Sequence, residues 1–207
     1  MKRDPFIGFP MPRLPSVLPR AVLTLAEVLK LLRPQSREAA EARDLLAIEV
    51  LYATGLRVSE LCALDVADLD MARRLVRVRL GKGAKDRVVP MGRTTAAKLQ
   101  AHVSEREPPG PRLARPVFVS SRGRRLTPAA VEALLRREAQ RRSITKRVTP
   151  HTLRLRHAFA THLIQNGASL PHVQEMLGHA KISSAQNYVR LAIPDLRRVH
   201  RKTHPLG

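Results

Sequence analysis

The 207-residue sequence has few aromatic residues, no tryptophan and a single cysteine. Because Cys62 has no partner in the chain, no internal disulfide can form, and a reducing cytoplasm is the expected location. No run of about 18 apolar residues occurs, so the sequence predicts no transmembrane helix and no membrane partner. The first 20 residues are basic but interrupted by prolines, a pattern that fits neither a signal peptide nor a transit helix.

Acidic residues are scarce relative to basic ones. The sequence has 38 Lys and Arg against 17 Asp and Glu, a formal net charge of +21. Such an excess favours a polyanionic partner, and nucleic acid is expected before membrane because no basic amphipathic anchor stands out. The hydrophobic content of 43% is typical of a folded globular protein rather than of a disordered basic tail.

The hydrophobic pattern predicts a mainly α-helical chain with a small antiparallel β-sheet. Thr24 and Ser36 are expected to cap the first two helices, which end at Leu32 and Tyr52. Later helices are predicted over residues 57–64, 94–103, 127–142, 149–165 and 169–177. Alternating residues predict a strand over 75–80, a hairpin partner over 87–90 and a short strand over 117–120.

The residues that carry chemistry gather between Thr149 and Tyr188. His151 and Arg154 are spaced i and i+3, so they share one face of a predicted helix whose start suits a phosphate. A second helix ends at Leu177–Gly178–His179, and Tyr188 follows nine residues after the histidine. Alone, this stretch indicates a phosphate site with a candidate nucleophile.

These residues resemble the tyrosine recombinase family, which comprises site-specific DNA recombinases and phage-type integrases. The family pattern of His-x-x-Arg, Leu-Gly-His and a tyrosine nine residues on is matched by His151, Arg154, Leu177–His179 and Tyr188. Upstream, residues 54–60 resemble the first-arginine motif of the family and residues 81–85 its lysine hairpin. The segment from Tyr188 to Pro205 is similar to the Xer subgroup. The resemblance implies the tyrosine recombinase catalytic-domain fold.

The resemblance also implies a role for each matching residue. Tyr188 would attack a DNA phosphate and form a 3′-phosphotyrosyl bond, which would make the chain a tyrosine-type DNA recombinase that needs no ATP. Arg57, Arg154 and His179 would hold the non-bridging oxygens, Lys82 would protonate the leaving oxygen, and His151 would assist proton movement. Glu60 is expected to orient Arg57. No cofactor or metal is expected, because cations around one spot attract a phosphate and repel a metal.

One departure from the family pattern concerns the second arginine. The family runs His-x-x-Arg-His, whereas this chain reads Arg154-Leu155-Arg156-His157, as if two residues were inserted. Two residues turn a helix by about 200°. Arg154 is the preferred prediction because it keeps His151 three residues before it, and Arg156 is the alternative. The extra pair is then expected to be absorbed downstream, for example as a helical bulge; otherwise the site would be misassembled.

The resemblance gives the expected domain organisation and partners. Residues 1–20 are predicted to be an extended proline-rich leader, and residues 21–207 a catalytic domain with a C-terminal docking tail. The family normally places a DNA-clamping domain before the catalytic one, and that clamp is expected to be absent. The implied partners are double-stranded DNA and either further copies, as a tetramer on DNA, or a related recombinase.

Three other functions remain open from the sequence. A catalytically impaired DNA-binding relic is the main alternative, because of the expected missing clamp and the insertion at residues 155–156. A type IB topoisomerase would share the chemistry without pairing sites. A basic structural or ribosome-associated protein would bind nucleic acid without using Tyr188.

Overall fold

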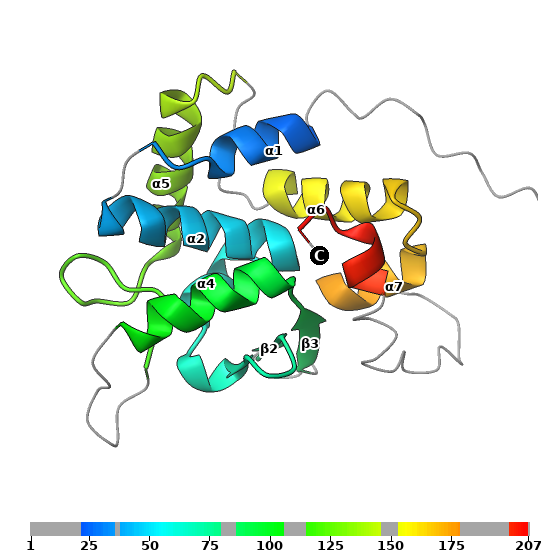
Figure 1. Cartoon of the computed structure of the whole chain (residues 1–207), viewed down its shortest axis with the longest axis horizontal. Coiled ribbons are helices and arrows are strands. Elements are labelled where there is room, and N and C mark those ends of the chain that lie inside the picture. Colours follow the sequence, from blue (N-terminus) through cyan, green and yellow to red (C-terminus); the bar gives the residue numbers. More distant parts are fainter. Residues whose placement is uncertain are drawn as a thin grey trace, which may run out of the picture.

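The structure, a computed structural model, describes residues 22–35, 38–79, 86–105, 115–145, 153–178 and 199–206. The expected leader over residues 1–20 lies outside these ranges. The helices are α1 (Leu25–Leu32), α2 (Ala39–Thr54), α3 (Val58–Ala63), α4 (Arg93–Ser104), α5 (Pro128–Arg141), α6 (Leu153–Gln165) and α7 (Leu170–Leu177), and a short 3₁₀ turn, η1, spans Val66–Asp68. Together with a three-stranded antiparallel sheet, they confirm the predicted fold class (Figure 1).

The N-termini of α1 and α2 show whether the predicted caps form. The Thr24 hydroxyl accepts from the Glu27 amide at 3.2 Å while the Glu27 carboxylate accepts from the Thr24 amide at 2.7 Å. The predicted cap at Thr24 is therefore confirmed, in the form of a capping box. The prediction that Ser36 caps α2 is wrong. The N-cap is Glu38, and Glu41 in the first turn accepts from the Gln35 amide at 3.0 Å, which ties the preceding chain to the helix.

Helix α2 lies at the centre of the fold and packs against α1, α3, α4, α5 and α6 (Figure 1). The apolar residues Leu45, Ile48, Leu51 and Tyr52 are buried, but so is every other residue from Asp44 to Thr54. A helix covered by neighbours on all sides has no solvent face to keep polar. Helix α2 is therefore the central helix of the core, and the five helices named above pack around it.

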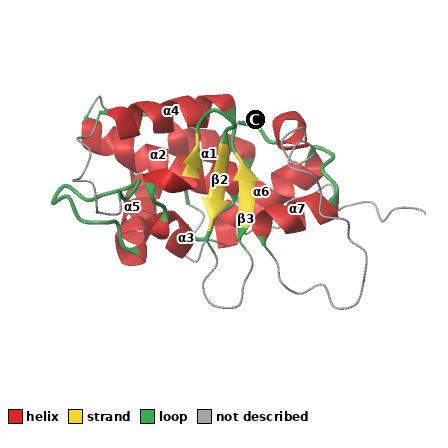
Figure 2. Ribbon diagram, turned by 90° about the horizontal axis from the view of Figure 1, so that it is seen from below, coloured by secondary structure: helices red, strands yellow, loops and turns green. Residues whose placement is uncertain are grey.

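The sheet has the order β1 (Leu69–Asp70), β2 (Leu75–Val78) and β3 (Arg87–Pro90). The predicted hairpin is confirmed, and Val78 opposite Arg87 is its last described pair. Strand β1 was not predicted, because two residues are too short to show an alternating pattern. The strand predicted over residues 117–120 is wrong: only isolated bridges form there, one of them between Val119 and Arg125. Figure 2 shows the sheet between two groups of helices, and α7 packs on β3.

The described part of the C-terminal tail, residues 199–206, packs on its own chain. His200 donates from Nε2 to the carbonyl oxygen of Ala53 at 2.7 Å, which satisfies a free carbonyl at the end of α2. The His200 and His204 rings stack with centroids 4.7 Å apart, and the ring of Tyr52 lies 4.8 Å from that of His204. His162 of α6 is buried and hydrogen-bonds the Tyr52 hydroxyl at 2.8 Å.

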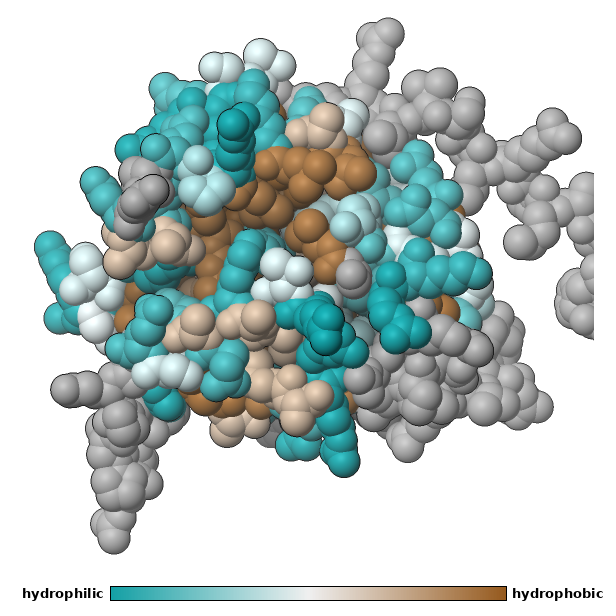
Figure 3. Space-filling model, in the orientation of Figure 1, coloured by the Kyte–Doolittle hydropathy of each residue, from teal (hydrophilic) through white to brown (hydrophobic). Residues whose placement is uncertain are grey.

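The surface combines hydrophilic margins with apolar areas. In Figure 3 hydrophobic colour gathers in the middle of the visible face, in the region of α1 and α2. The large exposed apolar side chains of the described residues are Leu25, Leu29 and Leu170. None of the described helices is both long enough and apolar enough to span a bilayer.

Candidate active site

The turn after α2 explains the Thr-Gly-x-Arg motif. Gly55 ends the helix with φ of 62°, a conformation that side chains with a Cβ rarely adopt. A Cβ on this residue would also lie 2.5 Å from Cδ1 of Phe159, so α6 can approach only because the position is glycine. The turn delivers Arg57 to the N-cap of α3.

Glu60 holds Arg57, as the sequence predicted. Its carboxylate accepts from the Arg57 amide at 2.7 Å and from the Arg57 Nη1 at 2.8 Å. Burial by itself would raise the pKa of Glu60, but hydrogen bonds from Arg87 and Arg57 lower that pKa to about 2. The Glu60 side chain is buried whereas that of Arg57 is 42% exposed, so the guanidinium can meet a ligand from solution.

Arg156, on α6, lies beside Arg57 and Glu60, and the three residues form one charged cluster. Its Nη1 donates to the carbonyl oxygen of Gly55 at 2.6 Å, its Nη2 donates to the carbonyl oxygen of Leu177, and it lies 3.9 Å from Glu60. Burial, followed by the positive charge of Arg57, lowers the pKa of Arg156 to about 10. The guanidinium therefore stays charged at neutral pH in a crowded cationic environment.

The register of α6 bears on the choice between the two arginines. The helix is α-helical without interruption from Leu153 to Gln165, so the predicted downstream bulge is wrong. Phe159 and Leu163, three and seven residues after Arg156, are buried in the core, which fixes the face that Arg156 shares with them. Since two residues turn a helix by about 200°, Arg154 and Arg156 cannot face the same spot. The side chain of Arg154 is not among those that the structure describes.

Sequence reasoning missed Arg87 as a member of this cluster. Its Nη1 and Nη2 donate to Oε1 and Oε2 of Glu60 at 2.8 and 2.7 Å, and its Nε donates to the carbonyl oxygen of Met176 at 2.9 Å. A signal was present: Arg87 and Val89 are two residues apart, so they share one face of β3, and both are buried. An arginine on the core face of a strand requires a buried acceptor.

Several predicted site residues lie outside the described ranges: Lys82, His151, His179 and Tyr188. In the sequence, Lys82 lies between Val78 and Arg87, which form the last described pair of the hairpin, and His179 directly follows Gly178, which ends α7 with φ of 64°. The structure thus brings together Arg57 and Arg156, and adds Glu60 and Arg87 beside them.

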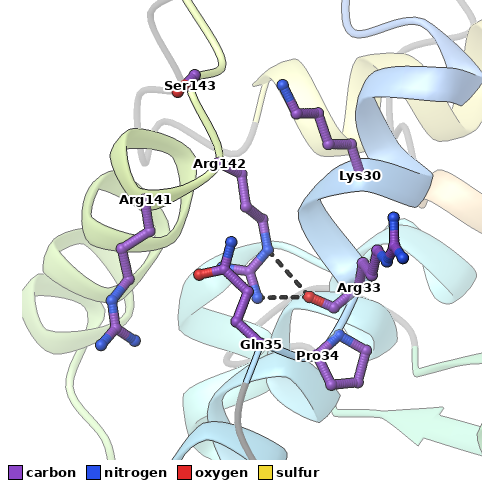
Figure 4. A pocket seen from close by; sticks show the side chains of 7 residues that line it. All are labelled: Lys30, Arg33, Pro34, Gln35, Arg141, Arg142 and Ser143. Atoms are coloured by element: carbon purple, nitrogen blue, oxygen red, sulfur yellow. Dashed lines mark hydrogen bonds between the residues drawn. The ribbon is translucent and has the colours of Figure 1, made fainter.

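A separate basic pocket of about 370 Å³ lies between the ends of α1 and α5 (Figure 4). Lys30, Arg33, Arg141 and Arg142 line it and no acid does. Arg142, however, donates to the carbonyl oxygen of Arg33 at 2.7 Å and pairs with Glu41 at 3.0 Å and with Glu138. Two helix C-termini also end there, so their carbonyls offset part of the remaining positive charge.

Comparison with known proteins gives the class to which this fold and cluster belong. Residues 21–193 match the phage integrase family. Tyrosine recombinase XerD of Listeria innocua is 40% identical over 212 aligned residues, covering 99% of this chain and 69% of that protein. The crystal structure of XerA recombinase superimposes with a TM-score of 0.70 at 35% identity, over 82% of this chain and 58% of that one.

A further solved relative is XerH site-specific recombinase bound to its difH substrate. It is 27% identical, with a TM-score of 0.66 over 78% of this chain and 48% of the XerH chain. The chain belongs to the phage integrase family of tyrosine recombinases and is Xer-like. It spans about two thirds of the length of the XerD relative and less of the solved ones.

Proposed function

We propose that this chain cuts and rejoins duplex DNA at specific sites through a 3′-phosphotyrosyl intermediate. The observation that carries the proposal is the pair formed by Arg57 and Arg156 around Glu60, 2.8 and 3.9 Å from its carboxylate. One carboxylate cannot neutralise both guanidiniums and Arg87 as well, so the cluster retains net positive charge. A phosphate whose charge grows as the phosphorus is attacked would be stabilised there.

We assign the other predicted site residues to the individual bond and proton transfers of the reaction. The Tyr188 oxygen would attack phosphorus while the bond to the 5′-oxygen breaks, and Lys82 would give that oxygen its proton. His179 would join Arg57 and Arg156 on the non-bridging oxygens, and His151 would assist the proton of Tyr188. Of the two arginines we favour Arg156, because it lies buried beside Arg57 in the described cluster. Arg154 remains the alternative.

Double-stranded DNA is the proposed partner, in a cytoplasmic setting. The net charge of +21 supports it, as does the likeness to XerH, solved on its difH substrate. Exchange between two duplexes requires several protomers, so we expect assembly into a tetramer on DNA or pairing with a related recombinase. Mass photometry with and without a target duplex would detect such assembly, and binding should weaken steeply with salt.

The experiment that tests the proposal is covalent trapping. A library of nicked duplexes with a randomised centre would be incubated with the protein, and DNA in denaturation-resistant adducts would be recovered and sequenced. We expect a defined sequence to be enriched, and Tyr188→Phe to recover none. If the wild-type chain binds duplex DNA and yields no adduct from the library, the recombinase proposal fails and the DNA-binding relic takes its place.

A further inference from the structure

Arg87 lies where three parts of the proposed site meet. It is the first residue of β3, and its cross-strand partner is Val78; Lys82 lies between the two in the sequence. Its two terminal nitrogens form a bidentate pair with Glu60 on α3, and its Nε reaches Met176 in the last turn of α7. Its side chain is only 7% exposed, so it is not offered to a ligand.

The contacts of Arg87 and Arg156 with α7 are adjacent in sequence. Arg87 donates to the carbonyl oxygen of Met176 and Arg156 donates to that of Leu177. Both carbonyls are at the end of a helix, where intrahelical partners are missing. Gly178 and His179 follow in the sequence, so the two charge-assisted hydrogen bonds hold the backbone just before the histidine.

Gly178 packs directly on the Arg87 side chain. A Cβ at Gly178 would lie 2.8 Å from Cδ and 3.0 Å from Nη1 of Arg87. The turn and the Arg87 side chain are thus in direct contact, and only a residue without a Cβ leaves room for the guanidinium. Glu60, held by the same guanidinium, in turn fixes Arg57.

We propose that Arg87 is a positioning residue for strand transfer, which aligns Arg57 and the end of α7 directly before His179. It acts through Glu60 and Met176 and does not touch DNA. This inference rests on the proposed function. Because reacting groups must be aligned closely, a shift of about 1 Å can lower a rate by roughly 100-fold without preventing binding.

The test uses Arg87→Lys, which keeps the positive charge but removes the guanidinium that binds both oxygens of Glu60. Arg142→Lys is the matched control. Arg142 is also buried and paired with two carboxylates, Glu41 and Glu138, but shares no residue with the site. The first measurement is amide hydrogen exchange of residues 173–178. We expect exchange about tenfold faster in Arg87→Lys and within about threefold of wild type in Arg142→Lys, since only the first loses the bond to Met176.

The second measurement is the single-turnover rate of adduct formation on a nicked duplex recovered from the trapping library, at saturating DNA. For Arg87→Lys we expect a rate about 100-fold lower with a Kd within about threefold of wild type. The inference would be overturned if Arg87→Lys showed the amide exchange and the rate of adduct formation of the wild type. It would also be overturned if Arg142→Lys changed both quantities as much as Arg87→Lys does. If the wild-type chain forms no adduct, the proposed function fails, and hydrogen exchange alone decides whether Arg87 holds the turn.

Discussion

The Arg156 guanidinium donates to the carbonyl oxygen of Gly55 at 2.6 Å, two residues before Arg57 in the chain. This contact joins the fourth quarter of the sequence to the first-arginine motif and places the two cations beside one carboxylate, Glu60. An arginine that far along the chain reaches this position only because Gly55 lets α6 approach.

The choice between the two arginines of α6 can be tested directly. Arg156→Gln should lower the rate of adduct formation by about 100-fold or more, as expected when one donor to a developing oxyanion is removed. Arg154→Gln should change the rate by less than about threefold, as expected for a substitution outside the site. Single-turnover cleavage of a library-derived duplex measures both. The reverse ranking would assign the role to Arg154 and show that the insertion is accommodated differently.

Much of the fold could be predicted from sequence because local signals were strong. The capping box at Thr24, the glycine after α2 and the hairpin strands all depend on nearby residues. The burial of α2 on all sides could not be predicted, because it depends on helices distant in sequence. Within the site, Arg57 and Glu60 were predictable from one motif, whereas Arg87 and the register of α6 depend on long-range contacts.

Glu60→Gln tests the balance of charge in the cluster. Removing the carboxylate leaves Arg87 and Arg156 buried without their acid, which should destabilise the fold by about 3 kcal/mol at pH 7. Because the folded pKa of Glu60 is depressed to about 2, its contribution is complete above about pH 4.5 and is lost as the pH falls towards 2. Urea unfolding of both proteins between pH 7 and 3 measures this. A difference that stays constant with pH would contradict the assignment.

Gly178→Ala and Gly167→Ala form a matched pair. Both glycines have positive φ, 64° and 91°, so each alanine should cost about 1 kcal/mol of backbone strain. A Cβ at Gly167 meets nothing within 4 Å, whereas one at Gly178 meets Arg87. Gly178→Ala should therefore be the less stable variant in thermal unfolding and should also slow adduct formation. Equal effects of the two substitutions would mean that the contact with Arg87 is unimportant.

The histidine cluster of the C-terminal segment should make its docking depend on pH. Burial lowers the pKa of His200 to about 4, and it also lowers the pKa of His162 and that of His204. Tyr52 lies beside these histidines, and burial raises its pKa. A histidine with a depressed folded pKa stabilises fully above its unfolded value, about 6.5, and its contribution falls as the pH drops towards 4. At pH 5, His200 alone should account for a loss of about 2 kcal/mol.

His200→Gln separates this effect from general acid sensitivity, because its amide can still donate to Ala53 but does not titrate. We expect the variant to lose less stability than wild type between pH 7.5 and 5 in thermal unfolding. His157→Gln, at an exposed histidine of α6, should behave as wild type. If His200→Gln loses as much stability as wild type over this interval, His200 is not the titrating group.

The most direct measurement of the central claim is mass spectrometry of the trapped adduct after digestion with nuclease and protease. The chain has two tyrosines, and Tyr52 is buried in the core. The account predicts a nucleotide joined through its 3′-phosphate to the peptide that contains Tyr188, with a free 5′-hydroxyl on the released strand. A nucleotide on any other residue, or a 5′-phosphate linkage, would contradict it.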